Sequence, residues 1–145
     1  MAEKKLLLYD DLEVGKRFKP FVYVLSQETI RKYAEAVEDT NPLYLDENYA
    51  AKSSFGGTIG HPTTAAIYSL SAIMTEGEMP PGGIHAKQYF EFRTPPRPAD
   101  ILTTTATVAD KYIRRERKYV VFETNTVNQN GETVVVGKMT AIWPQ

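Results

Sequence analysis

The chain of 145 residues contains no cysteine and only two histidines. Without cysteine there is no disulfide scaffold, no thiol nucleophile and no thiolate metal site. The histidines, His61 and His85, lie more than twenty residues apart. That spacing is a poor basis for a metal site, which needs several such ligands close together. We therefore expect no bound metal.

A large net charge and long apolar runs are also lacking. The 17 Lys and Arg residues nearly balance the 18 Asp and Glu residues, so the charge does not indicate binding to nucleic acid or to an acidic membrane surface. No segment approaches the ~18 apolar residues of a membrane span, and the apolar run at residues 6–8 is too short for a signal peptide. We expect a single domain over residues 1–145, soluble and cytoplasmic.

Glycine loops that cradle phosphates are absent as well. The pairs Gly56-Gly57 and Gly82-Gly83 do not have the spacing of a P-loop or of a dinucleotide-binding turn. The chain does have an ordinary globular composition, with 42% apolar and 24% charged residues, which excludes a disordered chain. The order of those residues along the chain indicates the fold.

A helix is indicated after Ser26, whose hydroxyl offers an N-cap. Between Ile30 and Val37 the apolar side chains fall at positions i, i+3, i+4 and i+7, which is one face of a helix. Pro42 marks the end of this helix, because the residue before a proline avoids the helical conformation. Asp39 is therefore predicted at or just beyond the helix C-terminus. A further short helix is expected up to Ala51.

A second long helix is predicted from Pro62 to Glu76. Proline is well tolerated at the first helical position, and Gly77 is a natural stop. The residues between them are apolar around most of the circumference, which is typical of a buried helix. We expect this helix to form the centre of the domain, with the Asp39 carboxyl directed at its first turn across a subunit boundary.

Alternating and β-branched segments fill most of the remaining chain. The expected strands cover residues 17–25, 86–92, 101–109, 119–122 and 133–143. Pro20 places the first strand at a sheet edge or marks a strand start, and Asn130-Gly131 indicates a hairpin turn before the last. This order predicts an α+β fold in which about five antiparallel strands, the later ones in meander order, wrap one long buried helix. An uncovered sheet edge makes a dimer the expected assembly.

One segment carries a family motif. Residues 39–44 read Asp-Thr-Asn-Pro-Leu-Tyr, followed by Ala50 and by Phe-Gly-Gly at 55–57. This resembles the hydratase motif of the MaoC-like dehydratases, Asp-x-Asn-Pro-x-His. Tyr44 at the last motif position, together with residues 83–92, is more similar to the FAS1-like or MaoC N-terminal branch of that family. The resemblance implies a hot dog fold and a hydratase or dehydratase that acts on acyl thioesters.

The resemblance also implies roles for individual residues. Asp39 matches the motif aspartate, which shares a water molecule and the acid/base role with the motif histidine. Tyr44 stands in the histidine position, and its ordinary pKa of ~10 makes it a hydrogen-bond donor at neutral pH. Pro62 replaces a glycine whose N–H serves the thioester oxygen, and proline has no N–H. His61 is the candidate for the missing acid or base, and Thr63 or Thr64 for the missing donor.

Substrate binding is expected at further positions. The resemblance assigns it to Asn41 and Pro42 in the motif and to Gly57 after it, and the thioester would be carried by coenzyme A or by an acyl carrier protein, with no other cofactor. Basic side chains suit the phosphates of such carriers. The candidates are Arg93, Arg97, Arg114, Arg115, Arg117 and Lys118. A charged run is also typical of a solvated strand edge.

Several alternatives stay open. Asp39 works with Tyr44 or His61 in an enzyme that acts alone, or this chain builds the acyl tunnel and a MaoC-like paralogue in a heterodimer supplies the chemistry. A non-catalytic acyl-CoA binding module and a hot dog thioesterase are the other classes. Each residue also has a purely structural interpretation: residues 39–42 form an ordinary helix-ending turn, and Tyr44 and His61 provide packing and a structural hydrogen bond.

Overall fold

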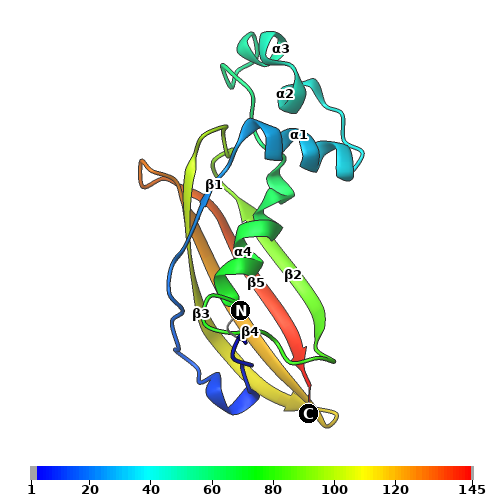
Figure 1. Ribbon diagram of the computed structural model, residues 1–145, viewed down its shortest axis with the longest axis vertical. Coiled ribbons are helices and arrows are strands. Elements are labelled where there is room, and N and C mark those ends of the chain that lie inside the picture. Colours follow the sequence, from blue (N-terminus) through cyan, green and yellow to red (C-terminus); the bar gives the residue numbers. More distant parts are fainter. Residues whose placement is uncertain (1–2, 145) are drawn as a thin grey trace.

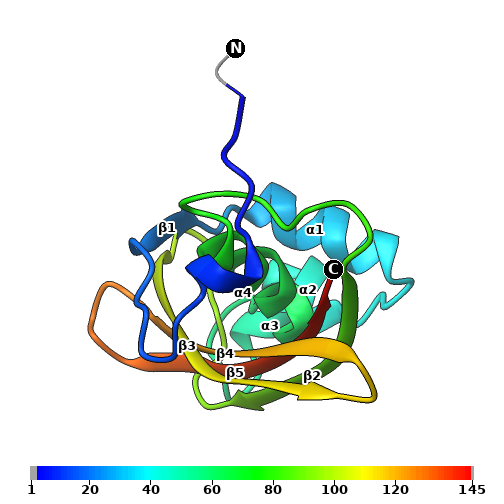
Figure 2. The same cartoon turned by 90° about the horizontal axis from the view of Figure 1, so that it is seen from below.

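The computed structural model describes residues 3–144 as one curved antiparallel sheet around a central helix (Figure 1). The sheet has five strands in the spatial order β1-β3-β4-β5-β2. Their bounds are β1 (Phe21–Val24), β2 (Ile84–Phe92), β3 (Ile101–Arg114), β4 (Arg117–Val127) and β5 (Thr133–Trp143). Viewed from below, the sheet curves around one side of the helix (Figure 2).

The central helix, α4 (Ala65–Ile73), follows a single 3-10 turn, η2 (Pro62–Thr64). Its buried side chains are Ala65, Tyr68, Ser69, Ala72 and Ile73. The predicted buried helix is therefore confirmed, but it ends at Ile73 and not at Glu76. The chain leaves the helix there because residues 77–78 run beside the N-terminal segment, where Leu7 N–H donates to the Glu78 carbonyl at 2.8 Å.

The order of the strands differs in part from the predicted meander. Strands β3, β4 and β5 are consecutive neighbours, whereas β2 pairs with β5 at one edge and β1 pairs with β3 at the other. The edge position predicted for the first strand is confirmed, although regular pairing begins only after Pro20. The turn at Asn130-Gly131 is also confirmed, with Gly131 at φ +77°.

The charged run at 114–118 is a hairpin turn that the sequence did not indicate. Arg115 and Glu116 both adopt the left-handed conformation, with φ of 49° and 63°. Two such residues form the turn whose twist matches that of the flanking strands. Glycine and asparagine usually fill these positions, so two charged residues gave no signal. As a result β3 and β4 are longer than predicted and extend to Arg114 and from Arg117.

Three helices form a cap at one end of the sheet: α1 (Gln27–Ala36), α2 (Pro42–Leu45) and α3 (Glu47–Ala51). Ser26 caps α1 as predicted, since its Oγ accepts from the N–H of Thr29 at 3.0 Å. Asp46 caps α3 through the N–H of Tyr49 at 3.0 Å. Pro42, predicted only to end α1, is also the first residue of α2, where its missing N–H costs no hydrogen bond.

The core consists of two apolar clusters along α4. One surrounds the C-terminal half of the helix and includes Trp143, whose indole N–H donates to the carbonyl of Leu7 at 2.8 Å. The other packs the start of α4 against α1 and includes Ile30 and Ala34. This second cluster fixes where the end of α1 lies relative to the start of the central helix. Within residues 3–144 no helix is long and apolar enough to cross a membrane.

Candidate active site

Asp39 reaches the site because α1 ends in a left-handed turn. Glu38 has φ +57°, and the N–H of Asp39 donates to the carbonyl of Ala34 at 2.9 Å. A left-handed residue is a common way to close a helix and redirect the chain. The backbone N–H of Asn41 donates to Oδ1 of Asp39 at 3.3 Å. The turn thus holds the carboxylate just beyond the helix, as predicted.

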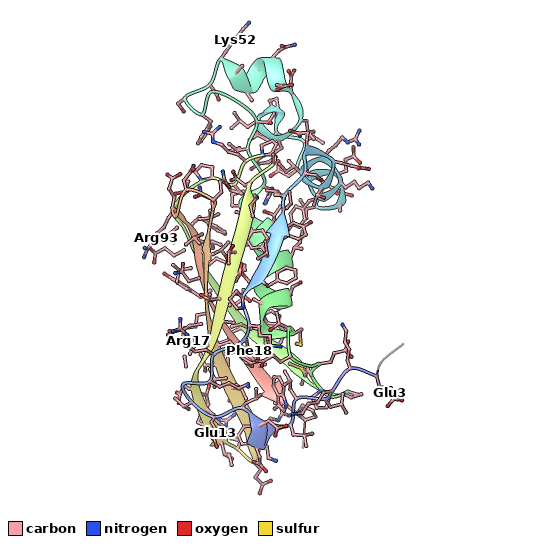
Figure 3. The ribbon with its side chains drawn as sticks, turned by 60° about the vertical axis from the view of Figure 1, so that its left-hand side comes forward. Glu3, Glu13, Arg17, Phe18, Lys52 and Arg93 are labelled. Atoms are coloured by element: carbon pink, nitrogen blue, oxygen red, sulfur yellow. The ribbon has the colours of Figure 1, made fainter. Side chains whose placement is uncertain are left out.

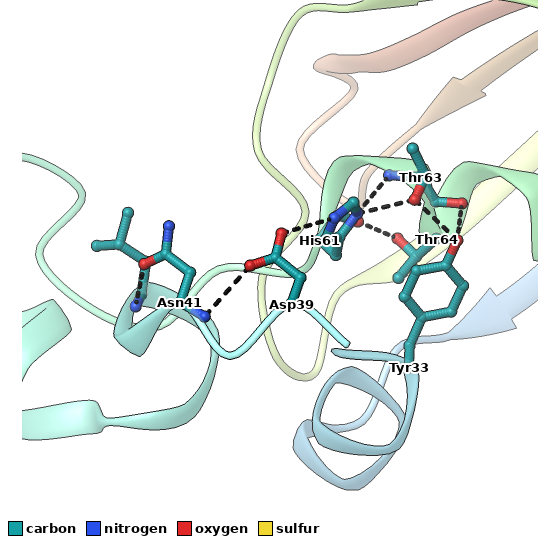
Figure 4. Close-up of polar contacts among 7 residues, drawn as sticks. Tyr33, Asp39, Asn41, His61, Thr63 and Thr64 are labelled. Atoms are coloured by element: carbon teal, nitrogen blue, oxygen red, sulfur yellow. Dashed lines mark hydrogen bonds and ion pairs between the residues drawn. The ribbon is translucent and has the colours of Figure 1, made fainter. Parts of the chain in front are cut away.

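The partner of this carboxylate is His61. Its Nε2 lies 3.1 Å from Oδ2 of Asp39, with the imidazole 18% and the carboxylate side chain 42% exposed (Figure 4). His61 immediately precedes Pro62 and caps η2. The Asp39 carboxyl therefore does point at the start of the central helix. Both residues belong to one chain, and no subunit boundary is needed between them.

The second nitrogen of His61 also has partners. Its Nδ1 accepts from the backbone N–H of Thr63 at 3.1 Å and lies 2.8 Å from the Thr63 hydroxyl oxygen. Tyr33, on α1, places its own hydroxyl 2.9 Å from the Thr63 carbonyl oxygen and 2.8 Å from Thr63 Oγ1. A connected set of hydrogen bonds therefore runs from Asp39 through His61 and Thr63 to Tyr33 (Figure 4).

Tyr44, which stands in the position of the motif histidine, packs beside this set. It is buried, and its ring centroid lies 5.2 Å from that of His61. Burial raises the pKa of Tyr44, and the Asp39 carboxylate raises it further. The Tyr44 hydroxyl makes no hydrogen bond to any residue of the described chain. It is therefore a protonated donor without a protein partner, close to Asp39.

The turn at the start of the central helix has no spare backbone donor in its first residues. Pro62 lacks an N–H, and the N–H of Thr63 is directed at His61. The N–H and the hydroxyl of Thr64 both donate to the His61 carbonyl, at 3.0 and 2.8 Å. Thr63 and Thr64 were predicted to replace the donor lost at Pro62. In this structure their N–H groups and the Thr64 hydroxyl instead form hydrogen bonds within the turn.

An apolar cavity of about 200 Å³ adjoins the chain on either side of His61. Gly60 and Pro62 form one wall of this cavity, and Phe92 of β2 forms another. The remaining lining residues are Phe55, Ile59, Arg93, Thr94, Pro95, Pro96, Val134 and Val135. Gly60 allows this wall to pack closely, since a Cβ there would lie only 3.1 Å from the Pro96 side chain.

Other predicted binding residues have structural partners. Asn41 caps α2, with Oδ1 accepting from the N–H of Leu43 at 3.0 Å, and Pro42 is the first residue of that helix. The loop that contains Gly57 is held by Arg97, whose guanidinium donates to the Phe55 carbonyl at 2.7 Å. These contacts position the loop between Asp39 and His61. Asn41 and Pro42 do not line the cavity.

Two of the arginines predicted to bind the carrier, Arg93 and Arg115, lie far apart. Arg93 lines the cavity and projects outward at the sheet edge, where its Nε donates to Glu91 at 2.8 Å (Figure 3). Arg115 occupies the β3–β4 turn, at the end of the sheet opposite the helical cap (Figure 1). Within one chain, therefore, Arg93 is near the candidate site and Arg115 is not.

Tyr33 is the residue at this site that sequence reasoning did not find. It lies three residues after Ile30, a spacing that matches the apolar face predicted for this helix. A tyrosine in such a pattern gives no sign that its hydroxyl will meet a residue of another element. The described residues hold no group of three or more His, Cys, Asp or Glu side chains that could bind a metal.

Comparison with known proteins extends these observations. The family model of the FAS1-like dehydratase domain region matches residues 13–136. The chain belongs to this family. An (R)-specific enoyl-CoA hydratase of Rhodospirillum rubrum is 30% identical over 99% of this chain and 98% of its own length. A mitochondrial 3-hydroxyacyl-[acyl-carrier-protein] dehydratase of Arabidopsis thaliana is 32% identical over 99% of this chain and 82% of its own.

The structure of this FAS1-like dehydratase family member matches solved hydratases. The unliganded R-hydratase PhaJ1 from Pseudomonas aeruginosa superimposes with a TM-score of 0.81 at 28% identity, covering 95% of this chain and 86% of that one. The predicted hot dog fold is therefore confirmed, as is the predicted family.

Proposed function

We propose that this chain is a hydratase or dehydratase that adds water to, or removes it from, an acyl thioester. The observation that carries the proposal is the Asp39–His61 contact beside an apolar cavity, on the turn that begins the central helix. A fixed carboxylate next to an apolar site suits proton transfer to and from a substrate whose acyl chain is apolar. The family and the relatives named above support this reaction class.

In the hydration direction Asp39 accepts a proton from water as the water oxygen bonds to the β-carbon of the enoyl group. The double-bond electrons move toward the thioester carbonyl and form an enolate. The enolate then collapses as its α-carbon takes up the proton that Asp39 accepted. One carboxylate thus serves as base and then as acid, so that the elements of water are added without a second proton donor.

Tyr44 supplies the hydrogen bond that Pro62 is unable to give. Its hydroxyl has no hydrogen-bond partner among residues 3–144, and the raised pKa keeps it protonated at neutral pH. A donor directed at a developing enolate oxygen typically lowers the barrier by about 3 kcal/mol. We therefore assign to Tyr44 the stabilisation of the thioester oxygen, and to Asp39 the proton transfers.

The cavity beside Gly60 and Pro62 is the proposed site of the acyl chain. Its walls are largely aromatic, proline and valine side chains, which favour an alkyl group over a polar one. Arg93 at its edge is exposed enough to meet a phosphate of coenzyme A or an acidic residue of an acyl carrier protein. Arg115 would reach a carrier only if a second subunit brought its turn to the site.

We further propose that the chain dimerises through the edge strand β2. This strand pairs with β5 on one side only, and its large side chains Ile84, Tyr89 and Phe92 are 49%, 57% and 48% exposed. An unpaired edge with exposed apolar side chains is a liability unless another chain covers it. Light scattering after size-exclusion chromatography tests this, and a monomer at micromolar concentration would contradict it.

The partner chain is either a second copy or a MaoC-like paralogue. The absence of a backbone donor at Pro62 and Thr63 favours the paralogue, because an intact site in the partner would then supply the chemistry. If neither chain supplies the chemistry, the protein is a non-catalytic acyl-CoA binding module. It predicts stoichiometric binding without turnover.

The deciding experiment uses the purified protein with a short 2-enoyl-CoA, followed by loss of the conjugated thioester absorbance. Turnover by the protein alone supports an independent enzyme. Turnover that appears only after co-expression with a paralogue supports a subunit role. Binding without turnover in either preparation supports the binding module. Release of free coenzyme A thiol, measured with a thiol reagent, would instead indicate a thioesterase.

A further inference from the structure

We propose that Thr63 and Tyr33 fix the imidazole of His61 in the tautomer that carries its proton on Nε2, so that His61 positions Asp39 and does not itself accept a proton. This inference rests on the proposed function for its catalytic meaning. The tautomer itself follows from hydrogen bonds that do not depend on any substrate.

The backbone N–H of Thr63 decides the tautomer. An amide hydrogen has a fixed direction, and this one points at Nδ1 of His61 over an N···N distance of 3.1 Å. A proton on Nδ1 would place two hydrogens on the same line. Nδ1 must therefore present its lone pair, and a neutral imidazole then carries its single proton on Nε2. That nitrogen lies 3.1 Å from Oδ2 of Asp39 and donates to it.

The Thr63 hydroxyl strengthens the same choice. Its oxygen lies 2.8 Å from Nδ1, and because Nδ1 is an acceptor, the hydroxyl has to be the donor. Tyr33 restrains Thr63 in turn, since its hydroxyl lies within hydrogen-bond distance of both the Thr63 carbonyl and the Thr63 hydroxyl. The Tyr33 ring also packs on the imidazole, with a centroid distance of 5.6 Å.

One helix thus supports both members of the Asp39–His61 pair. Tyr33 lies in α1, and the chain that leaves the C-terminal end of α1 carries Asp39. A shift of α1 would move the carboxylate and the support of the imidazole together. The relative geometry of the pair is therefore protected against small motions of the helical cap.

The arrangement differs from that of a Ser-His-Asp triad. There the carboxylate accepts from Nδ1–H and leaves Nε2 free to act as base. Here the carboxylate accepts from Nε2–H and Nδ1 is filled by Thr63, so neither ring nitrogen has a free lone pair. Asp39, whose side chain is 42% exposed, retains acceptor capacity toward a bound water. His61 is a positioning residue, and so are Thr63 and Tyr33.

Nitrogen NMR of the histidines tests the tautomer without any substrate. The chain has only two histidines, and a His85→Gln variant leaves the signals of His61 alone. At about pH 8, above the ordinary titration range of histidine, we expect long-range proton–nitrogen correlations with a protonated Nε2 and an acceptor Nδ1. A protonated Nδ1 would overturn the proposal, whether or not the protein turns over substrate.

Conservative variants test the roles of Tyr33 and Thr63. Tyr33→Phe keeps the ring on the imidazole and removes the hydroxyl, and Tyr49→Phe is the matched control at an exposed position on α3. We expect Tyr33→Phe and Thr63→Val to lower kcat about tenfold with little change in KM, because one neutral hydrogen bond that orients a catalytic group is lost. Thr63→Ser should restore the rate.

The same variants carry the spectroscopic readout. In Tyr33→Phe and Thr63→Val the nitrogen shifts of His61 should move away from the values of a single, strongly hydrogen-bonded tautomer, whereas Tyr49→Phe should leave them unchanged. Unchanged His61 shifts in both variants would overturn the positioning role. If no preparation hydrates an enoyl thioester but the shifts behave as expected, the proposed function fails and the tautomer assignment stands.

Discussion

Asp39 Oδ2 and His61 Nε2 lie 3.1 Å apart, and this contact joins the end of α1 to the start of the central helix. The carboxylate side chain is 42% exposed, so the contact contributes little to the free energy of unfolding, as is usual for pairs that water can reach. Its importance is geometric, since it holds a carboxylate against His61, whose neighbours Gly60 and Pro62 line the apolar cavity.

Replacing Asp39 by Asn should abolish most of the activity without unfolding the protein. Asparagine keeps the size of the side chain but does not accept a proton at neutral pH. We expect kcat to fall by about 10²–10⁴, the usual contribution of general acid–base catalysis. The measurement is the rate of absorbance loss with a short 2-enoyl-CoA. Asp46→Asn is the matched control, because Asn and Asp cap α3 equally well; an Asp39→Asn enzyme with the full rate would exclude Asp39 as base.

Tyr44→Phe isolates the phenolic hydroxyl. Phenylalanine retains the buried ring beside His61 and loses only a hydroxyl that has no hydrogen-bond partner among the described residues. The melting temperature should therefore stay nearly constant, while kcat falls by about 10²-fold if the hydroxyl stabilises the thioester oxygen. Parallel thermal melts and turnover assays check both expectations. Equal loss of stability and activity would indicate a packing role instead.

Tyr44→His together with Pro62→Gly should raise activity above that of the unchanged protein, whereas Tyr44→His alone removes the proposed donor to the thioester oxygen and should lower it. The first change restores the motif histidine, and the second restores a backbone N–H at the start of the central helix. The assay compares kcat/KM of the two single variants, the double variant and the unchanged protein. No gain in the double variant would contradict the correspondence drawn between these positions and the family motif.

Phe92→Ala should extend the range of acyl chains. Phe92 lines the cavity but is 48% exposed, so its truncation enlarges the cavity at a small cost in stability. We expect kcat/KM for a C8 enoyl-CoA to rise relative to a C4 substrate, by roughly tenfold for each additional methylene accommodated. Tyr89→Ala is the matched control, since Tyr89 lies on the same strand outside that cavity. If the C8 to C4 ratio of kcat/KM changed equally in both variants, the cavity would not be the site that selects the acyl chain.

Tyr68 predicts a specific loss of stability in alkali. Burial raises the pKa of Tyr68 from 10.0 to about 12. Unfolded chains then release this proton at lower pH than folded ones, so its contribution is complete below about pH 10 and decreases as the pH rises toward 12. The free energy of unfolding should fall by about 1.4 kcal/mol per pH unit for this group. Urea unfolding of the unchanged protein and of Tyr68→Phe at several pH values measures the difference; identical slopes would contradict the assignment.

The fold was largely predictable because its elements follow local patterns. A local pattern of a few residues predicts each of three features: the apolar face of α1 from Ile30 to Val37, the apolar α4 and the β-branched strands. The two features of the fold that were predicted wrongly also have local causes. The β3–β4 turn uses Arg115 and Glu116 in place of glycine or asparagine, and α4 ends early because residues 77–78 pair with the N-terminal segment.

The site was predictable only as a set of residues. The motif singled out Asp39 and Tyr44, and the family resemblance singled out His61, but their spacing along the chain did not say which of them touch. Thr63 and Thr64 were expected to donate to a substrate, and instead they donate to His61. A hydrogen bond within a turn depends on backbone directions that residue types leave open.

The sequence by itself determined the elements, the buried central helix and the family. Only the tertiary structure decided that Asp39 meets His61, that Tyr33 supports it through Thr63, and that Arg115 lies at the opposite end of the sheet. The reason is physical. Periodicity within a segment fixes its local conformation, whereas contacts between segments depend on how the apolar cluster around Ile30 and Ala34 seats α1 against the start of α4.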